Sequence, residues 1–168
     1  MRFIKLGLIS AVLIFLLMLA ISLLMPSSVV VSRAVNINAS ADSVYNMIND
    51  LSKWKLWLEN YDSTSAKLTT DAAGKVAQLK INATTIAIVE TTPKSIKTIW
   101  QAGSASPLPA SFDIISHDSS SLTTLHWQFN QKLKWYPWEK FAAIFSEKAL
   151  GPFMEKSLDN LKKLIERS

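Results

Sequence analysis

The sequence predicts an α+β domain in which a curved antiparallel sheet wraps around one long C-terminal helix, preceded by a single transmembrane helix. Three observations support this prediction. An uncharged apolar run covers residues 6–25, strand-like segments alternate with turns over 63–131, and a helical pattern follows Pro137 to the end of the chain. A sheet with one apolar face and a helix with one apolar stripe bury those surfaces by packing against each other.

The apolar N-terminal run is long enough to cross a bilayer. It has 20 residues without a charge, and a helix of that length rises about 30 Å, the thickness of the hydrocarbon core. Arg2 and Lys5 precede the run, and the next charged residue is Arg33. By the positive-inside rule, the N-terminus stays in the cytoplasm and the domain lies on the outer side of the cytoplasmic membrane. We assign residues 1–26 to a membrane anchor and 27–168 to the exported domain.

A cleaved signal peptide is the alternative interpretation of this segment. Residues 20–22 (Ala-Ile-Ser) offer small side chains for cleavage, but residues 23–25 (Leu-Leu-Met) would then form an apolar new N-terminus. Signal peptides also have a shorter apolar core than this run. We therefore favour an anchor that is retained.

Composition excludes several classes of function. The chain has no cysteine, which excludes a disulfide scaffold, a Cys-ligated zinc or iron–sulfur site and thiol catalysis. With two histidines and four glycines, the chain has no zinc-protease motif, no nucleophile elbow and no phosphate-binding glycine loop. The net charge is +5, but the cations form no stripe of the kind that nucleic acids require. We predict no metal, no cofactor and no nucleic-acid partner.

The exported domain is expected to begin with a strand and two short helices. Apolar and polar residues alternate over 29–38, directly after a linker at 26–28. Ser40 is a suitable N-cap for a helix that continues to Leu51, and a second short helix or tight turn covers 51–58. Five or six strands follow at intervals of about ten residues, which favours a meander of hairpins. Their expected ranges are 65–70, 75–82, 84–92, 95–101, 110–116 and 122–131.

The last helix has one apolar stripe and one charged face. Leu161 and Ile165 recur at helical spacing within the stripe. Asp159 and Lys163 form an i,i+4 pair on the opposite face. A Gly-Pro pair at 151–152 is expected to interrupt or kink this helix.

Two stretches of the chain carry a family resemblance. One is residues 32–45 (SRAVNINASADSVY), continued by Asn-Asp-Leu at 49–51 and the tryptophans that follow, and the other is 150–162 (LGPFMEKSLDNLK). Over residues 29–167 the chain resembles the START-like (SRPBCC, Bet v 1-like) superfamily, in particular its polyketide cyclase/dehydrase-type group. The resemblance implies a helix-grip fold with a hydrophobic cavity between the sheet and the long helix. Members bind lipids, sterols or polyketides and only some are enzymes, and no catalytic motif matches here residue by residue.

Nine residues are candidates for contact with a ligand in such a cavity. Arg33 has the phase of the apolar face of its strand and would bind a ligand carboxylate, unless it extends to solvent instead. Glu90 has the parity of Ile86 and Ile88 and either faces inward or lies at the rim of the sheet. Tyr45 either offers its hydroxyl to a ligand or packs as an aromatic ring. The aromatic candidates, for which core packing is the alternative, are Trp54, Trp57, Trp100, Trp127, Phe129 and Phe153.

A short aromatic and basic stretch precedes the last helix. Trp135, Tyr136 and Trp138 lie among lysines at 132, 134 and 140. Amphipathic aromatic rings flanked by cations are typical of segments at a membrane interface. The alternative is a hydrophobic staple and core packing at the start of the helix.

These patterns favour a membrane-anchored module that binds a hydrophobic ligand, either a lipid or a polyketide-like molecule, without catalysis. The alternatives are a cyclase- or dehydratase-type enzyme acting on a hydrophobic substrate, and a structural or interaction domain whose cavity is filled by side chains. The expected partners are membrane lipids and a hydrophobic small molecule. No pattern in the sequence indicates a protein partner.

Retention of the anchor is the first testable prediction. We expect the protein isolated from membranes to keep residues 6–25, because the run has spanning length and lacks a good cleavage site. N-terminal sequencing and intact mass measure this directly. A mature N-terminus near Leu23 would show that the segment is a signal peptide.

Overall fold

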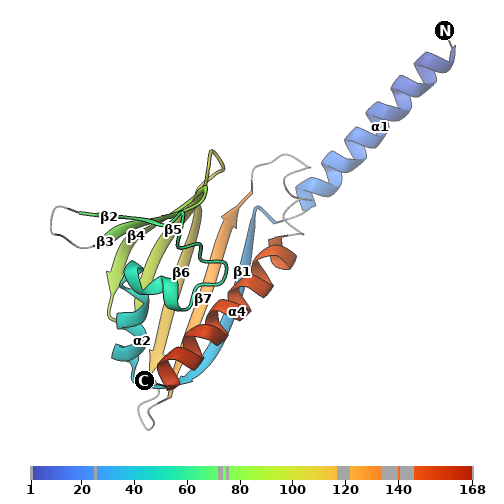
Figure 1. The fold of residues 1–168 in the computed structure, drawn as a ribbon. Helices are drawn as coiled ribbons and strands as arrows, with labels where there is room; N and C mark the ends of the chain where they lie inside the picture. The colour runs from blue at the N-terminus through green and yellow to red at the C-terminus, as the bar shows by residue number, and fades with distance from the viewer. Residues whose placement is uncertain are drawn as a thin grey trace.

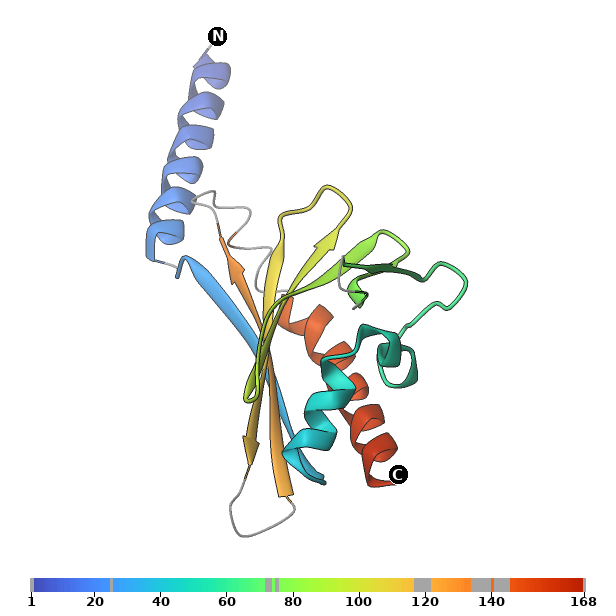
Figure 2. The same ribbon diagram turned by 90° about the vertical axis from the view of Figure 1, so that its left-hand side faces the viewer.

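The computed structural model of the chain contains a seven-stranded antiparallel sheet that curves around the C-terminal helix α4 (Ser146–Glu166), as the sequence predicts (Figures 1 and 2). The N-terminal helix α1 (Arg2–Leu24) projects away from this domain. Its length and composition suffice to cross a membrane, and most of its side chains are exposed. The structure describes residues 2–24, 26–71, 74, 76–116, 122–133, 140 and 146–167.

Strands β2 to β7 form a meander, and the first strand of the chain pairs with the last one at the edge of the sheet. Strand β1 (Ser28–Asn38) pairs with β7 (Leu122–Lys132), from Ser28 opposite Lys132 to Asn38 opposite Leu122. The strand order is β1-β7-β6-β5-β4-β3-β2, and every neighbouring pair is antiparallel. The remaining strands are β2 (Lys67–Thr70), β3 (Val76–Ile81), β4 (Thr84–Thr92), β5 (Ser95–Ala102) and β6 (Leu108–Ser116).

Several loops gather at the end of the sheet where β1 begins, which we call the α1 end. Because neighbouring strands are antiparallel, β7 ends there, and the turn from β3 to β4 and the hairpin from β5 to β6 lie there as well. Figure 2 shows this hairpin and the junction with α1 on the same end of the domain. The turn from β4 to β5 lies at the opposite end.

Two short helices follow β1, and both begin at capping side chains. The hydroxyl of Ser40 accepts a hydrogen bond from the Ser43 amide, 3.3 Å away, at the start of α2 (Ala41–Ile48). The carboxylate of Asp50 accepts one from the Ser52 amide at 2.9 Å, at the start of the 3₁₀ helix η1 (Leu51–Leu56). Both contacts satisfy amides that have no partner within the helix.

Helix α4 lays its apolar stripe on the concave face of the sheet. Met154, Leu158 and Leu161 are at most 2% exposed and belong to one core with side chains of the sheet, α2 and η1. Of the two alternatives for Gly151 and Pro152, an interruption or a kink, the interruption is wrong, because the helix runs through both residues. Proline removes one helical hydrogen bond, and ion pairs to β1 hold the turns on either side of it, as described below.

The packing of α4 yields a prediction about stability. Leu161→Ala removes a fully buried side chain and is expected to lower the free energy of unfolding by about 2–5 kcal/mol. Lys163→Ala lies on the exposed face of the same helix and is expected to change it by no more than about 0.5 kcal/mol. Chemical denaturation of both variants of the full chain, in the same detergent, measures the difference. Equal losses would contradict the observed orientation of the helix.

Candidate ligand-binding cavity

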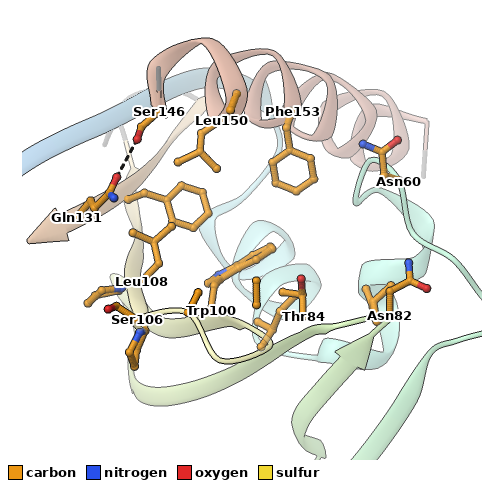
Figure 3. A pocket seen from close by; sticks show the side chains of 18 of the residues that line it. Asn60, Asn82, Thr84, Trp100, Ser106, Leu108, Gln131, Ser146, Leu150 and Phe153 are labelled. Atoms are coloured by element: carbon orange, nitrogen blue, oxygen red, sulfur yellow. Dashed lines mark hydrogen bonds between the residues drawn. The ribbon is translucent and has the colours of Figure 1, made fainter. Parts of the chain in front are cut away.

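A cavity of about 860 Å³ lies between α4 and the concave face of the sheet, at the α1 end (Figure 3). This volume lies within the range of roughly 300–1,000 Å³ that small-molecule sites occupy. Apolar side chains from β3 to β7 and from α4 form most of its wall. They include Ile81, Ile86, Trp100, Leu108, Phe129, Leu150 and Phe153.

Aromatic side chains fill the rest of the space between the sheet and α4. Trp127 stacks on Phe112 with ring centroids 4.9 Å apart, and its edge-to-face partner Trp57 lies 6.3 Å away. Trp100 contacts Trp127 on one side, at 5.9 Å, and lines the cavity on the other. The floor of the cavity is therefore a close-packed aromatic cluster.

Hydrogen bonds between different elements hold the rim of the cavity. The Ser146 hydroxyl, at the start of α4, donates to the side-chain carbonyl of Gln131 on β7 at 2.8 Å (Figure 3). The Gly103 amide in the β5–β6 hairpin donates to the carbonyl of Ala83 in the β3–β4 turn at 2.7 Å. Gly103 has φ +54°, a conformation that glycine adopts without steric strain. These contacts give the mouth a defined shape.

The cavity contains few charged groups. Among the described lining residues, only Glu59, in the loop after η1, and Lys132, at the end of β7, carry charge. The Glu59 carboxylate already pairs with Lys156 at 3.6 Å and accepts a hydrogen bond from Asn160 at 3.4 Å. No group of His, Asp or Glu among the described residues could hold a metal ion. The wall thus favours apolar contact over acid–base chemistry.

Comparison with known proteins identifies the family. Residues 28–166 match the sequence profile described as polyketide cyclase / dehydrase and lipid transport. The chain belongs to this family. The match covers the whole sheet and α4, and therefore every element that surrounds the cavity.

Solved structures from several bacteria share the fold of this polyketide cyclase/dehydrase family member. A START superfamily protein from Mycobacterium smegmatis aligns with a TM-score of 0.59 and 18% identity, over 82% of this chain and 97% of its own. A Nitrosospira multiformis protein aligns with a TM-score of 0.62 and 9% identity, over 80% and 94%. CalU16 from Micromonospora echinospora aligns with a TM-score of 0.55 and 12% identity, over 82% of each chain. No curated protein matches the chain.

Three of the nine ligand candidates line the cavity. Trp100, Phe129 and Phe153 contribute to its wall. Trp54, Trp57 and Trp127 do not line it, because they belong to the closed aromatic cluster and are at most 1% exposed. The indole N–H of Trp54 is also satisfied internally, since it donates to the carbonyl of Ile48 at 2.8 Å. For these three tryptophans, the alternative of core packing is therefore the correct one.

Tyr45 and Glu90 lie away from the cavity lining. Tyr45 is half-buried on α2 and packs against the core. Of the two alternatives for Glu90, the inward one is wrong, because a bulge between Ile88 and Glu90 shifts the register of β4 against β5. A bulge inserts one residue and reverses the alternation beyond it. Glu90 is exposed and pairs with Lys97 at 2.8 Å.

Arg33 takes neither of its two expected roles, contact with a ligand or extension into solvent. Its Nε donates to Glu155 and its Nη2 to Glu147, both at 2.6 Å, so the guanidinium joins the edge strand β1 to α4. These hydrogen bonds, first that of Glu147 and then that of Glu155, raise the pKa of Arg33. The guanidinium lies over Gly151, where an added Cβ would come within 2.5 Å of Nη2. Arg33 therefore fastens the helix to the sheet and is absent from the cavity wall.

The proposed interfacial residues Trp135, Tyr136 and Trp138 lie outside the described residues. Their role at a membrane stays a prediction.

The sequence analysis did not identify most of the residues that form the mouth of the cavity. The hairpin residues 105–109 and the loop at 58–60 line it, although the sequence marks them only as turns. One signal was present, since residues 98–112 contain no charged side chain, which is unusual for a hairpin exposed to water.

The contact between Arg33 and Gly151 predicts non-additive stabilities. Glycine in a helix costs about 1 kcal/mol relative to alanine, so Gly151→Ala in an Arg33→Ala background is expected to stabilise the protein by about that amount. With Arg33 present, the gain is lost, because the new methyl group displaces the guanidinium from its two carboxylates. Unfolding free energies of the four proteins form the double-mutant cycle. Equal gains in both backgrounds would contradict the close approach.

Proposed function

We propose that this chain is a membrane-anchored domain that binds a hydrophobic ligand in its cavity and catalyses no reaction. The observation that carries the proposal is the 860 Å³ cavity with its apolar and aromatic wall. A space of this size in a domain of this length is a costly feature for a purely structural module, because empty apolar volume destabilises a core. The cavity therefore disfavours the alternative of a filled interior.

The charge distribution in the cavity supports binding without catalysis. A cyclase or dehydratase step moves protons, which requires titratable groups in contact with the substrate. The only charged residues among the described lining are Glu59 and Lys132, and Glu59 already contacts Lys156 and Asn160. The deep wall, formed by residues such as Ile86 and Phe153, contributes only apolar contact.

Helix α1 supports the membrane location. It is uncharged from residue 6 to its end at Leu24, and most of its apolar side chains do not pack against the domain. Arg2 and Lys5 precede it, so the positive-inside rule favours a cytoplasmic N-terminus and a domain on the outer face of the cytoplasmic membrane.

Filling the mouth of the cavity tests the binding function. Ala102 and its neighbour Gln101 are both exposed, but only Ala102 lines the cavity. We expect Ala102→Trp to bind oleic acid several-fold more weakly than the wild type, since the indole occupies the volume that an acyl chain needs. Gln101→Trp is expected to bind as the wild type does. Native mass spectrometry of the full chain released from detergent measures the bound fraction.

Circular dichroism confirms that both variants are folded. Equal oleic acid adducts in all three proteins would place the fatty acid outside the cavity, and no adduct in any of them would contradict the binding of acyl chains.

A further inference from the structure

We infer that the mouth of the cavity opens towards the bilayer that holds α1. The ligand is then a long-chain amphiphile from the leaflet that faces the domain, and it enters the cavity without crossing water. The inference rests on the proposed function, to which it adds the source of the ligand and the orientation of the site. It follows from the position of the mouth in the domain, from the contacts that hold α1 to the domain, and from the chemistry of the residues that line the cavity.

The mouth and the anchor lie at the same end of the domain. The lining residues Thr84, Ala102, Lys132 and Ser146 all belong to strand or helix ends at the α1 end of the sheet. Only three residues separate the end of α1 from Ser28 at the start of β1, and three extended residues span about 10 Å. A domain on so short a connection keeps this end close to the membrane surface.

Contacts on both sides of the connection restrict its direction further. The Leu133 amide, just beyond β7, donates to the carbonyl of Ser27 at 2.9 Å. The Lys140 ammonium donates to the carbonyl of Ser22, in the last turn of α1, at 2.7 Å, and Lys140 is only 7% exposed. A cation at the C-terminus of a helix complements the helix dipole. The first contact ties the connection to Leu133, which lines the cavity, and the second gives the last turn of α1 a contact with Lys140.

Two loops at the α1 end carry no charge, in contrast to the turn from β4 to β5 at the opposite end. At the α1 end, the β5–β6 hairpin lies within the uncharged run 98–112, and the β3–β4 turn at 81–84 is uncharged too. At the opposite end, the β4–β5 turn carries Lys94, and the ion pair of Glu90 with Lys97 lies beside it. Uncharged loops enter an interface at little desolvation cost, whereas charged ones resist it.

The lining of the cavity indicates the chemistry of the ligand. Its wall offers mostly hydrocarbon and aromatic contact, with the polar side chains of Gln131 and Ser146 on one side and that of Asn60 on the other (Figure 3). An amphiphile with a long chain satisfies both regions when the chain lies inside and the polar head stays at the rim. Lys132 at the rim favours a head with negative charge.

Site-specific labels test the orientation, because the chain has no native cysteine. Ser106→Cys labels the mouth and Lys94→Cys labels the exposed turn at the opposite end. Each full-length variant carries a fluorophore and is reconstituted in vesicles of phosphatidylcholine and phosphatidylglycerol that contain a headgroup-nitroxide lipid. We expect several-fold stronger quenching at position 106 than at 94. Equal quenching, or stronger quenching at 94, overturns the orientation.

Photocrosslinking tests the entry of lipid. The unlabelled full chain is reconstituted in the same vesicles with a phosphatidylglycerol that carries a diazirine on its acyl chain, and is irradiated before it is solubilised. We expect adducts on cavity residues such as Trp100 and Phe153, several-fold fewer in Ala102→Trp, and a normal number in Gln101→Trp. Adducts on α1 are the internal control for reconstitution. When the diazirine lipid is supplied in separate vesicles, we expect the cavity adducts to be lost.

The outcomes separate the inference from the proposed function. Adducts on α1 without adducts in the cavity overturn the inference, and so does equal labelling from separate vesicles. The proposed function survives either result if oleic acid still binds in detergent and Ala102→Trp weakens that binding. If oleic acid also fails to bind, the proposed function fails together with the inference.

Discussion

The pairing of β1 with β7 is the constraint on which the rest of the structure depends. β1 follows the N-terminal helix directly, and β7 precedes the segment that leads to α4. Their antiparallel register, from Ser28 opposite Lys132 to Asn38 opposite Leu122, joins the two ends of the domain along one edge. It therefore decides that α1, the start of α4 and the rim of the cavity share one end of the sheet.

The interior between the sheet and α4 has two halves of different character. Near α2 and η1 it is a close-packed core, in which Trp54, Trp57, Phe112 and Trp127 contact one another through stacked, tilted and edge-to-face rings. Towards the α1 end the same concave surface continues as the wall of the cavity. The packed half supplies the stability that allows the other half to stay open, since burial of large aromatic rings contributes strongly to folding.

The sequence predicts the architecture well because its signals are local and periodic. The alternation in β1, the serine cap at Ser40 and the stripe through Leu161 each depend on neighbours in the chain. It predicts the cavity less well, because a cavity forms where elements far apart in the sequence, here the sheet and α4, do not pack against each other. Trp57 and Trp100 look alike in the sequence, yet one is sealed in the core and the other lines the opening.

Departures from regular periodicity explain the remaining errors. A single inserted residue before Glu90 reverses the face on which that carboxylate lies, and no sequence pattern marks the bulge. Arg33 keeps the inward phase of β1, but an edge strand brings an inward side chain to α4 and not into the cavity. The helix continues through Pro152 because contacts across the sheet edge outweigh a local preference for a break.

Gly151 lies beneath the guanidinium of Arg33 and leaves room for it because glycine has no side chain. Glu147, Gly151 and Glu155 follow one another at intervals of four on the side of α4 that faces β1, while Leu150 and Phe153 face the cavity. The missing side chain at 151 allows helix and strand to approach until the guanidinium alone separates them. The two ion pairs of Arg33 thus depend on the absence of a side chain at one residue. In a relative that keeps the arginine but has a larger side chain here, the guanidinium is pushed away from its two carboxylates, and the first half of the helix loses its attachment to the sheet edge although none of the residues that line the cavity has changed.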